Sequence, residues 1–249
     1  MTKEVTKTNN LITKGAKVGK LEVNEKELKL INKYTLEPLT AEQVFTFKVA
    51  ICDNEVDRDF EVFPQKSLDK MAKLFIGKTI IKDHAGKSDN QVARIYDTEV
   101  VEDSYTTKNN EPYAKLVARC YMVKTDSNKD LITEIQAGIK KEVSVRCSIN
   151  KTVCSICGID NRQGYCKHWG GREYDGKRCY FKLLEPKDAY EVSFVAVPAQ
   201  PNAGVIKNYT GEEKTYQEEN TEKEDLINSE LGLVKSFIFT EKERENENE

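Results

Sequence analysis

Alternation of apolar and polar side chains predicts most of the strands in this chain. From Phe45 to Ile51 the apolar residues recur at every second position, and this period of two indicates a strand with one buried face. Residues 142–149 alternate in the same way and predict a second half-buried strand. Further strands are expected over residues 91–101, 112–122, 180–184 and 190–197, and a short apolar run predicts a buried strand over residues 79–82.

Apolar residues spaced three and four apart predict a smaller number of helices. One spans residues 64–76, and a second spans residues 127–139 with Asp126 or Ser127 as its cap. A third is expected over residues 225–239, inside a Glu-rich tail. Strands therefore outnumber helices, and the pattern predicts an α+β fold with a mostly antiparallel β body.

The 249 residues are expected to form one domain, one insertion and two ends. A typical domain has roughly 150 residues, so the chain has room for one domain, which is expected over residues 41–207. A cysteine-rich insertion interrupts it at 151–180. Residues 1–40 are expected to form a flexible or partly ordered arm, and residues 208–249 an acidic tail. No window approaches the roughly 18 apolar residues of a membrane span, and the N-terminus lacks an apolar signal segment, so we expect a cytosolic chain.

Negative charge is concentrated near the C-terminus. The formal net charge is −3, yet the segment from Gly211 to Glu249 holds 13 acidic and 5 basic residues, a net of −8. The rest of the chain therefore carries +5, with its lysines scattered rather than gathered in one stripe. This distribution is not typical of a nucleic-acid-binding protein.

Three cysteines and one histidine lie at the spacing of a metal site. Cys154 and Cys157 form a Cys-x-x-Cys pair, and Cys166 and His168 follow. Tetrahedral Zn²⁺ takes four nitrogen or sulfur ligands, and this set leaves no position for water, so it predicts a structural zinc site. Cys179 is an alternative ligand in place of His168.

Two other interpretations of the insertion stay open, namely a metal-free loop with incidental thiols and a redox-active thiol pair. The glycine-rich run after Cys154 argues against the redox pair, which needs a strand–helix context. Trp169, the only tryptophan, is expected to pack against the metal site. Cys52, Cys120 and Cys147 lie in apolar strand patterns and are expected in the core.

Only two histidines occur in the chain, His84 and His168. If zinc takes His168, then His84 is the one imidazole left for acid–base chemistry. Ser144 is a candidate nucleophile, because a serine attacks once a histidine removes its proton. A structural histidine and a surface serine are the alternatives that spacing alone leaves open. The chain has no Gly-x-Ser-x-Gly sequence, which disfavours an α/β-hydrolase.

Four stretches, in this order along the chain, carry a family resemblance. They are residues 57–64 before a helix; Lys82-Asp83-His84 followed by residues 91–95; Gly138 followed by Ser144-Val145; and residues 190–195 followed by Pro198-Ala199. Together they resemble the prohead (capsid maturation) proteases of tailed phages, whose fold is similar to that of the herpesvirus assemblin proteases. The last two stretches are the most specific. The resemblance covers residues 42–207 apart from the insertion.

The resemblance implies a barrel-like, mostly antiparallel fold with a few surrounding helices and a serine protease site. Ser144 would be the nucleophile, and His84 the general base that later protonates the leaving amine. A third residue would orient the imidazole. Glu191 fits this role best because it lies in the closing strand motif, with Ser193 and Asp188 as alternatives. Backbone amides after Ser144 would form the oxyanion hole.

Two features depart from the family pattern. Arg146 stands two residues after the serine, where many relatives have a small residue or glycine. A cation there would either assist the oxyanion or narrow the site. The zinc insertion is absent from many relatives, and it would either steady the active-site strand or recognise scaffold or capsid protein.

In function, the resemblance implies virion assembly. Such an endopeptidase cleaves the phage scaffold protein or a scaffolding (delta) segment of the major capsid protein, and itself, inside the procapsid in the host cytoplasm. The arm and the tail would then be segments trimmed on activation, or plain disordered ends. A homodimer is a further option, because the herpesvirus relatives are activated by dimerising. No membrane and no specific nucleic acid is expected as a partner.

Other functions compete with this one. The first alternative is a catalytically inactive structural or scaffolding assembly protein that keeps the protease fold and a zinc knuckle. The second is a zinc-ribbon nucleic-acid binder, for which four Lys and Arg residues between positions 167 and 178 supply positive charge. If zinc takes Cys179, then His168 is released, and a Ser-His-His site of the herpesvirus kind becomes an option.

Overall fold

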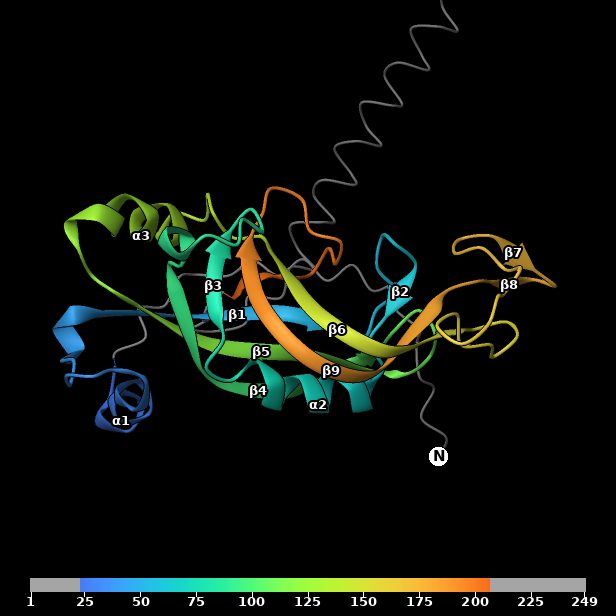
Figure 1. Ribbon diagram of the computed structural model, residues 1–249, viewed down its shortest axis with the longest axis horizontal. Helices are drawn as coiled ribbons and strands as arrows, with labels where there is room; N and C mark the ends of the chain where they lie inside the picture. The colour runs from blue at the N-terminus through green and yellow to red at the C-terminus, as the bar shows by residue number, and fades with distance from the viewer. Residues whose placement is uncertain (1–22, 207–249) are drawn as a thin grey trace, which may run out of the picture. The chain divides into compact units, whose positions relative to one another are not determined.

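The computed structural model describes residues 23–206, which form an α+β fold built on one large sheet (Figure 1). The strands are β1 (Val44–Asp53), β2 (Glu61–Val62), β3 (Thr79–Lys82), β4 (Ala93–Thr106), β5 (Pro112–Val123), β6 (Val143–Cys154), β7 (Glu173–Tyr174), β8 (Lys177–Arg178), β9 (Phe181–Phe194) and β10 (Gly204–Ile206). The helices are α1 (Glu25–Ile31), α2 (Gln65–Phe75) and α3 (Lys129–Gln136), with 3-10 turns η1 (Asn32–Tyr34), η2 (Ala41–Gln43), η3 (Ser88–Asn90) and η4 (Asp126–Asn128).

The main sheet is mostly antiparallel, as the alternation predicts. Its strands follow the order β10-β1-β5-β4-β3-β9-β2, and β6 also pairs with β9. Within residues 23–206, only the pairings of β9 with β2 and with β3 are parallel. The order is open, and a single bridge between Glu142 and Gly204 joins the start of β6 to β10. The mixed class is therefore confirmed, whereas barrel-like closure and an assemblin-like arrangement stay predictions.

The two strands predicted over residues 180–184 and 190–197 are one continuous strand, β9, so that prediction is wrong. Glu185 has a φ of 55°, and Pro186, which lacks an N–H, pairs with Ile149 where the register with β6 shifts. Proline is tolerated at such an irregularity. The break in the sequence pattern is therefore a local irregularity within the strand, and β9 continues past it to carry the closing motif.

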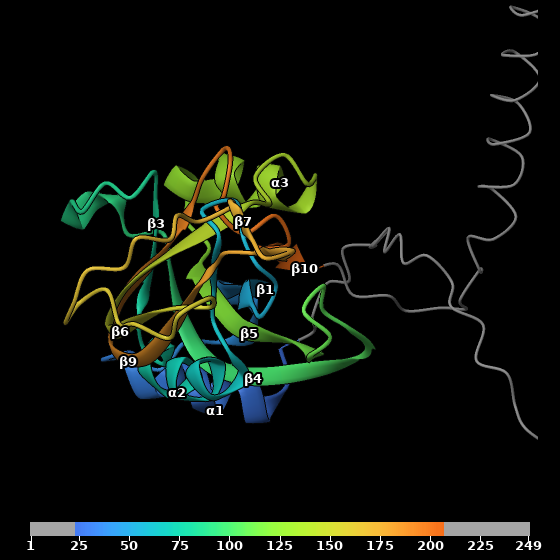
Figure 2. The same ribbon diagram turned by 90° about the vertical axis from the view of Figure 1, so that its right-hand side faces the viewer.

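Helix α2 confirms the helix predicted over residues 64–76, and its Leu68, Met71 and Phe75 are fully buried against the sheet. The helix predicted over 127–139 is shorter than expected, because η4 replaces its first turn and α3 ends at Gln136. Asp126 and Ser127 lie within η4, and the turn is closed by the side chain of Asn128, which accepts from the N–H of Thr125 at 3.0 Å. Helices α2 and α3 lie on opposite sides of the sheet in both views (Figure 2).

Part of the predicted N-terminal arm is helical. Helix α1 begins after Asn24, whose side chain accepts from the N–H of Glu27, and Ile31 packs with Val44 and Tyr96 in a small second core. The remainder of the arm (residues 1–22) and the acidic tail with its predicted helix 225–239 lie outside the described residues. No helix within residues 23–206 has the length and apolar character needed to cross a membrane.

Candidate functional site

His84, Glu191 and Ser193 meet where strands β3 and β9 end side by side. The parallel pairing places Thr79 opposite Glu191 and Ile81 opposite Ser193, so His84, two residues past the end of β3, arrives beside both. His84 Nδ1 lies 2.7 Å from Glu191 Oε1, and the His84 N–H donates to Ser193 Oγ at 2.8 Å. The structure therefore brings the candidate base into contact with two of the three candidate third residues.

The third candidate, Asp188, points to a different partner. Its Oδ1 lies 3.2 Å from Lys78 Nζ, and its side chain is 47% exposed. Glu191, in contrast, has a side chain that is only 8% exposed. A buried carboxylate needs a cation or a hydrogen-bond donor, and Glu191 finds both, in His84 and in Arg146, whose Nε lies 3.8 Å from the same oxygen. Only Glu191 has the geometry to orient the imidazole.

Ser144 lies on β6, directly opposite Ser193 on β9, and Arg146 lies opposite Glu191. Directly paired residues on neighbouring strands project from the same face of a sheet. Ser144 and Ser193 therefore share the face on which His84 rests. Within the described residues Ser144 Oγ makes no hydrogen bond, so the chain of contacts from acid to imidazole stops short of the serine. Catalytic hydrogen bonds are often long in ligand-free sites and tighten when substrate binds.

The backbone that carries His84 is held in an uncommon conformation. Asp83 and His84 have φ values of 55° and 52°, in the left-handed region that costs free energy for residues other than glycine. Four hydrogen bonds hold it there. Asp83 donates its N–H to the Phe194 carbonyl, the His84 N–H donates to Ser193, and the Asn90 amide donates to the carbonyls on either side of the pair. Hydrogen bonds therefore fix the backbone that presents the His84 imidazole.

A groove of about 380 Å³ runs beside Ser144 along β6, as far as Thr152. Its lining includes the buried apolar residues Val143 and Phe63. One wall is acidic and consists of Asp57, Asp59 and Glu61, and two arginines, Arg146 and Arg162, also line the groove. A groove that follows a strand and is lined by both apolar and charged residues suits a segment of extended polypeptide.

The acidic wall holds its carboxylates close together and partly away from water. Burial raises the pKa of Asp57 and of Glu61, and the neighbouring carboxylates raise the pKa of Glu61 further. A thiol, Cys147, also lines the groove, and burial raises its pKa to about 11. Cys147 is therefore protonated at neutral pH, which leaves Ser144 as the candidate nucleophile in the groove.

A larger cavity of about 1,020 Å³ lies elsewhere, between the start of β1 and helix α3. Its lining includes Phe45, Lys124 and Ile132 but no histidine and no cysteine. Volume alone therefore does not mark the candidate site in this protein. The smaller groove is the one whose lining includes Ser144 and Arg146, and Arg146 Nε lies 3.8 Å from the Glu191 carboxylate that His84 contacts.

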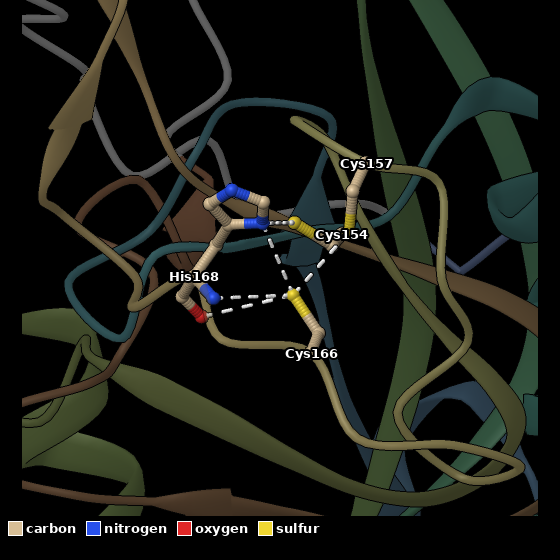
Figure 3. A group of neighbouring side chains, drawn as sticks. All are labelled: Cys154, Cys157, Cys166 and His168. Atoms are coloured by element: carbon tan, nitrogen blue, oxygen red, sulfur yellow. Dashed lines mark hydrogen bonds between the residues drawn. The ribbon is translucent and has the colours of Figure 1, made fainter.

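The four residues predicted as metal ligands converge in the insertion (Figure 3). One ligand atom from each of Cys154, Cys157, Cys166 and His168 lies within 4.8 Å of all the others. Cys157 Sγ is 3.4 Å from Cys166 Sγ, and His168 Nδ1 is 3.4 Å from Cys166 Sγ and 3.8 Å from Cys154 Sγ. Tetrahedral zinc with ordinary bond lengths would set S–S at about 3.8 Å and S–N at about 3.6 Å. The cluster therefore fits a metal ion.

The alternative ligand, Cys179, lies beside this cluster. Its Sγ is 3.8 Å from Cys154 Sγ, and the residue is fully buried, but it is not one of the four that all converge. Trp169 is 62% exposed, so the prediction that it packs against the site is wrong. Tyr174 takes that place, with its ring edge-on to His168 at 4.5 Å. Of the other three thiols predicted in the core, Cys52 and Cys120 are buried in the main core, and Cys147 is partly buried and packs against it.

The sequence did not single out the groove walls as part of the site. Asp57, Asp59 and Glu61 precede Ser144 by more than 80 positions, and Arg162 comes from the insertion. No spacing rule links such distant segments, so only the folded chain brings them together. Comparison of the chain with protein-family models, curated proteins and solved structures found no match.

Proposed function

We propose that this chain is a serine endopeptidase with Ser144 as nucleophile, His84 as general base and Glu191 as the residue that orients the imidazole. The observation that carries the proposal is the 2.7 Å contact between His84 Nδ1 and Glu191 Oε1, next to the strand that bears Ser144. A contact between a buried carboxylate and an imidazole, with a serine on the paired strand, is the constellation that activates a hydroxyl.

The reaction follows from these roles. Ser144 Oγ bonds to the scissile carbonyl carbon while its proton passes to His84 Nε2. The C–N bond then breaks, and His84 returns the proton to the leaving amine. Water attacks the resulting ester, gives its proton to His84 and releases the acid, and Ser144 regains its hydrogen. Glu191 stabilises the imidazolium through Nδ1, and Arg146 sits close enough to share that carboxylate.

For the biological setting, the proposal draws on the resemblance to the tailed-phage prohead proteases, with an assemblin-like, barrel-like body. The substrates are then the phage scaffold protein and the scaffolding segment of the major capsid protein, together with this chain itself. Cleavage takes place inside the procapsid, in the host cytoplasm. The elongated groove beside Ser144 supports a polypeptide substrate.

We also propose that the Cys/His cluster binds one structural Zn²⁺. Three thiolates and one imidazole complete a tetrahedral site, and structural zinc sites have no open position. Few aliphatic residues are available to fold the insertion, and the hydrophobic residues packed against its three buried cysteines are Ile156, Tyr174 and Phe181. Metal binding then supplies much of the free energy that orders this segment.

The test is co-expression of the full chain with the phage scaffold and major capsid proteins, with cleavage sites mapped by mass spectrometry. The parent chain should cut its partners, and Ser144→Ala should cut neither them nor itself. A fluorophosphonate, which labels activated serines, should modify the parent at Ser144 and fail to modify His84→Ala. Ser148→Ala, on the same strand, is the control and should stay active.

A second candidate is a structural assembly protein without catalytic activity. The missing hydrogen bond between Ser144 and His84 favours it. If Ser144→Ala processes the partners as well as the parent chain does, the enzyme assignment is wrong. If neither chain cleaves anything and the parent resists the fluorophosphonate, the structural role is the better account.

A further inference from the structure

We infer that Phe60 is a positioning residue that couples the Cys/His cluster to the groove wall beside Ser144, so that metal binding shapes the substrate site. The effect on catalysis rests on the proposed function. The coupling itself rests on contacts between Phe60 and the insertion, and on the way its loop is closed.

On one side, Phe60 packs against the insertion. A Cβ on Gly171 would lie 2.5 Å from Phe60 Cζ, and a Cβ on Gly170 would lie 3.1 Å from Phe60 Cβ. Gly171 also has a φ of +83°, and its N–H donates to the Cys179 carbonyl at 2.8 Å. Because Gly170 comes two residues after His168, the ring rests on the segment that a bound metal would hold in place.

On the other side, Phe60 belongs to a closed loop. Its φ of 59° is uncommon for a residue with a side chain, so surrounding contacts must hold it. The Phe60 N–H donates to the Asp57 carbonyl, and the Phe60 carbonyl accepts from Phe181 at 2.8 Å. Asp57 Oδ1 accepts the N–H groups of Asp59 and Glu61 at 2.9 and 2.8 Å. Hydrogen bonds therefore join the three acidic residues of the groove wall to Phe60 in one closed loop.

A second connection runs directly from the insertion to the groove. Arg162 lines the groove, and its N–H donates to Asp160 Oδ1 at 3.1 Å. The same oxygen accepts from the N–H of Thr152 on β6 at 3.0 Å. Two walls of the groove thus depend on the insertion, whereas His84, Glu191 and Ser144 lie on or beside β3, β9 and β6. Loss of the metal should weaken substrate binding more than it slows the bond-making step.

Hydrogen exchange tests the coupling without using activity. The protein is the full-length Ser144→Ala chain, compared with its zinc and after removal of zinc by a chelator. We expect the amides of Phe60 and Glu61 to exchange at least about tenfold faster without zinc, while those of α2 are unchanged. Equal exchange of the loop amides in the two samples would overturn the inference, whatever the protein's activity.

Substitution of Phe60 separates its role from that of the metal. Phe60→Ala should keep one zinc per chain yet show the fast loop exchange, and Phe60→Leu should restore part of the protection. Tyr165→Ala, which removes an 83% exposed aromatic ring from the same insertion, is the matched control. Slow loop exchange in Phe60→Ala would show that the ring does not carry the coupling.

Steady-state kinetics then measure how the loss of the Phe60 ring affects substrate binding. On a peptide that spans the mapped scaffold cleavage site, Phe60→Ala should raise KM about tenfold and leave kcat within about twofold. A fall in kcat with unchanged KM would overturn the positioning role. If the parent chain cleaves no peptide at all, the proposed protease function fails, and the exchange experiment still decides the coupling on its own.

Discussion

His84 Nδ1 lies 2.7 Å from Glu191 Oε1, although the two residues stand 107 positions apart in the chain. An ionised carboxylate only accepts hydrogen bonds, so the imidazole donates through Nδ1 and keeps Nε2 free to take a proton. Glu191 is thereby placed to select the tautomer that a general base requires. Burial of this carboxylate strengthens the contact, because little water competes for it.

Replacement of Glu191 by glutamine should remove this control of the tautomer. An amide of the same shape fits the space but can donate a hydrogen bond to Nδ1. The neutral imidazole would then carry its proton on Nε2 and could not accept the proton of Ser144. We expect Glu191→Gln to lower kcat by about 10⁴-fold with little change in melting temperature. Asp188→Asn is the control and should stay within about twofold of the parent. Equal losses in both variants would contradict the assignment of Glu191.

Ser193 should matter for a different reason. It is fully buried, and its hydroxyl accepts the N–H of His84, which lies in the left-handed region. Ser193→Ala leaves that N–H without its partner, so we expect a loss of about 1–3 kcal/mol in the free energy of unfolding and a partial loss of activity. Chemical denaturation measures the first effect. Ser88→Ala, an exposed serine of the same loop, should leave both quantities unchanged, and an equally stable Ser193→Ala protein would refute this role.

The ligand set of the metal site can be tested one residue at a time. Cys157→Ser and His168→Ala should each lose the bound zinc during dialysis against metal-free buffer, because each removes one of the four converging ligands. Cys179→Ser should retain one zinc per chain, as measured by elemental analysis. The opposite outcome, with zinc kept in His168→Ala and lost in Cys179→Ser, would establish the alternative four-cysteine set.

The acidic groove wall makes a prediction about pH. Burial, together with Asp57 and Asp59, raises the pKa of Glu61, so the charged form of Glu61 is disfavoured in the folded protein. This penalty is present above the folded-state pKa and disappears as pH falls below the ordinary value of a glutamate. Glu61→Gln should therefore raise the melting temperature at about pH 7.5. The gain in the free energy of unfolding should be less than about 1 kcal/mol, because solvent screens the group, and near about pH 3.5 the melting temperature should change little.

The matched control for this experiment is Glu37→Gln, which neutralises an exposed carboxylate away from the groove. It should show no pH-dependent gain. A Glu61→Gln protein that is less stable than the parent at about pH 7.5 would mean that Glu61 makes a favourable charge interaction, with Arg162 as the partner to test next.

The sequence by itself determined the features that depend on short-range spacing. Period-two and period-3.6 patterns located β1, β6 and α2, because side-chain direction repeats within a few residues. The metal ligands were predictable for the same reason, since Cys154 to His168 span 15 residues and converge in one tight loop. The pattern wrongly predicted two strands on either side of Pro186, because a local irregularity within a strand looks the same in sequence as a strand end.

Only the tertiary structure decided how Glu191, Ser193 and Asp188 lie relative to His84, because all three lie in one stretch and the sequence favoured Glu191 only through its place in the family motif. The parallel register of β3 against β9 determines these contacts. It places the His84 imidazole beside the Glu191 carboxylate and the His84 N–H beside the Ser193 hydroxyl. The packing of Phe60 on Gly171 was likewise invisible in the sequence. Both relationships join segments about 110 positions apart, and such contacts depend on strand register and packing rather than on any local pattern.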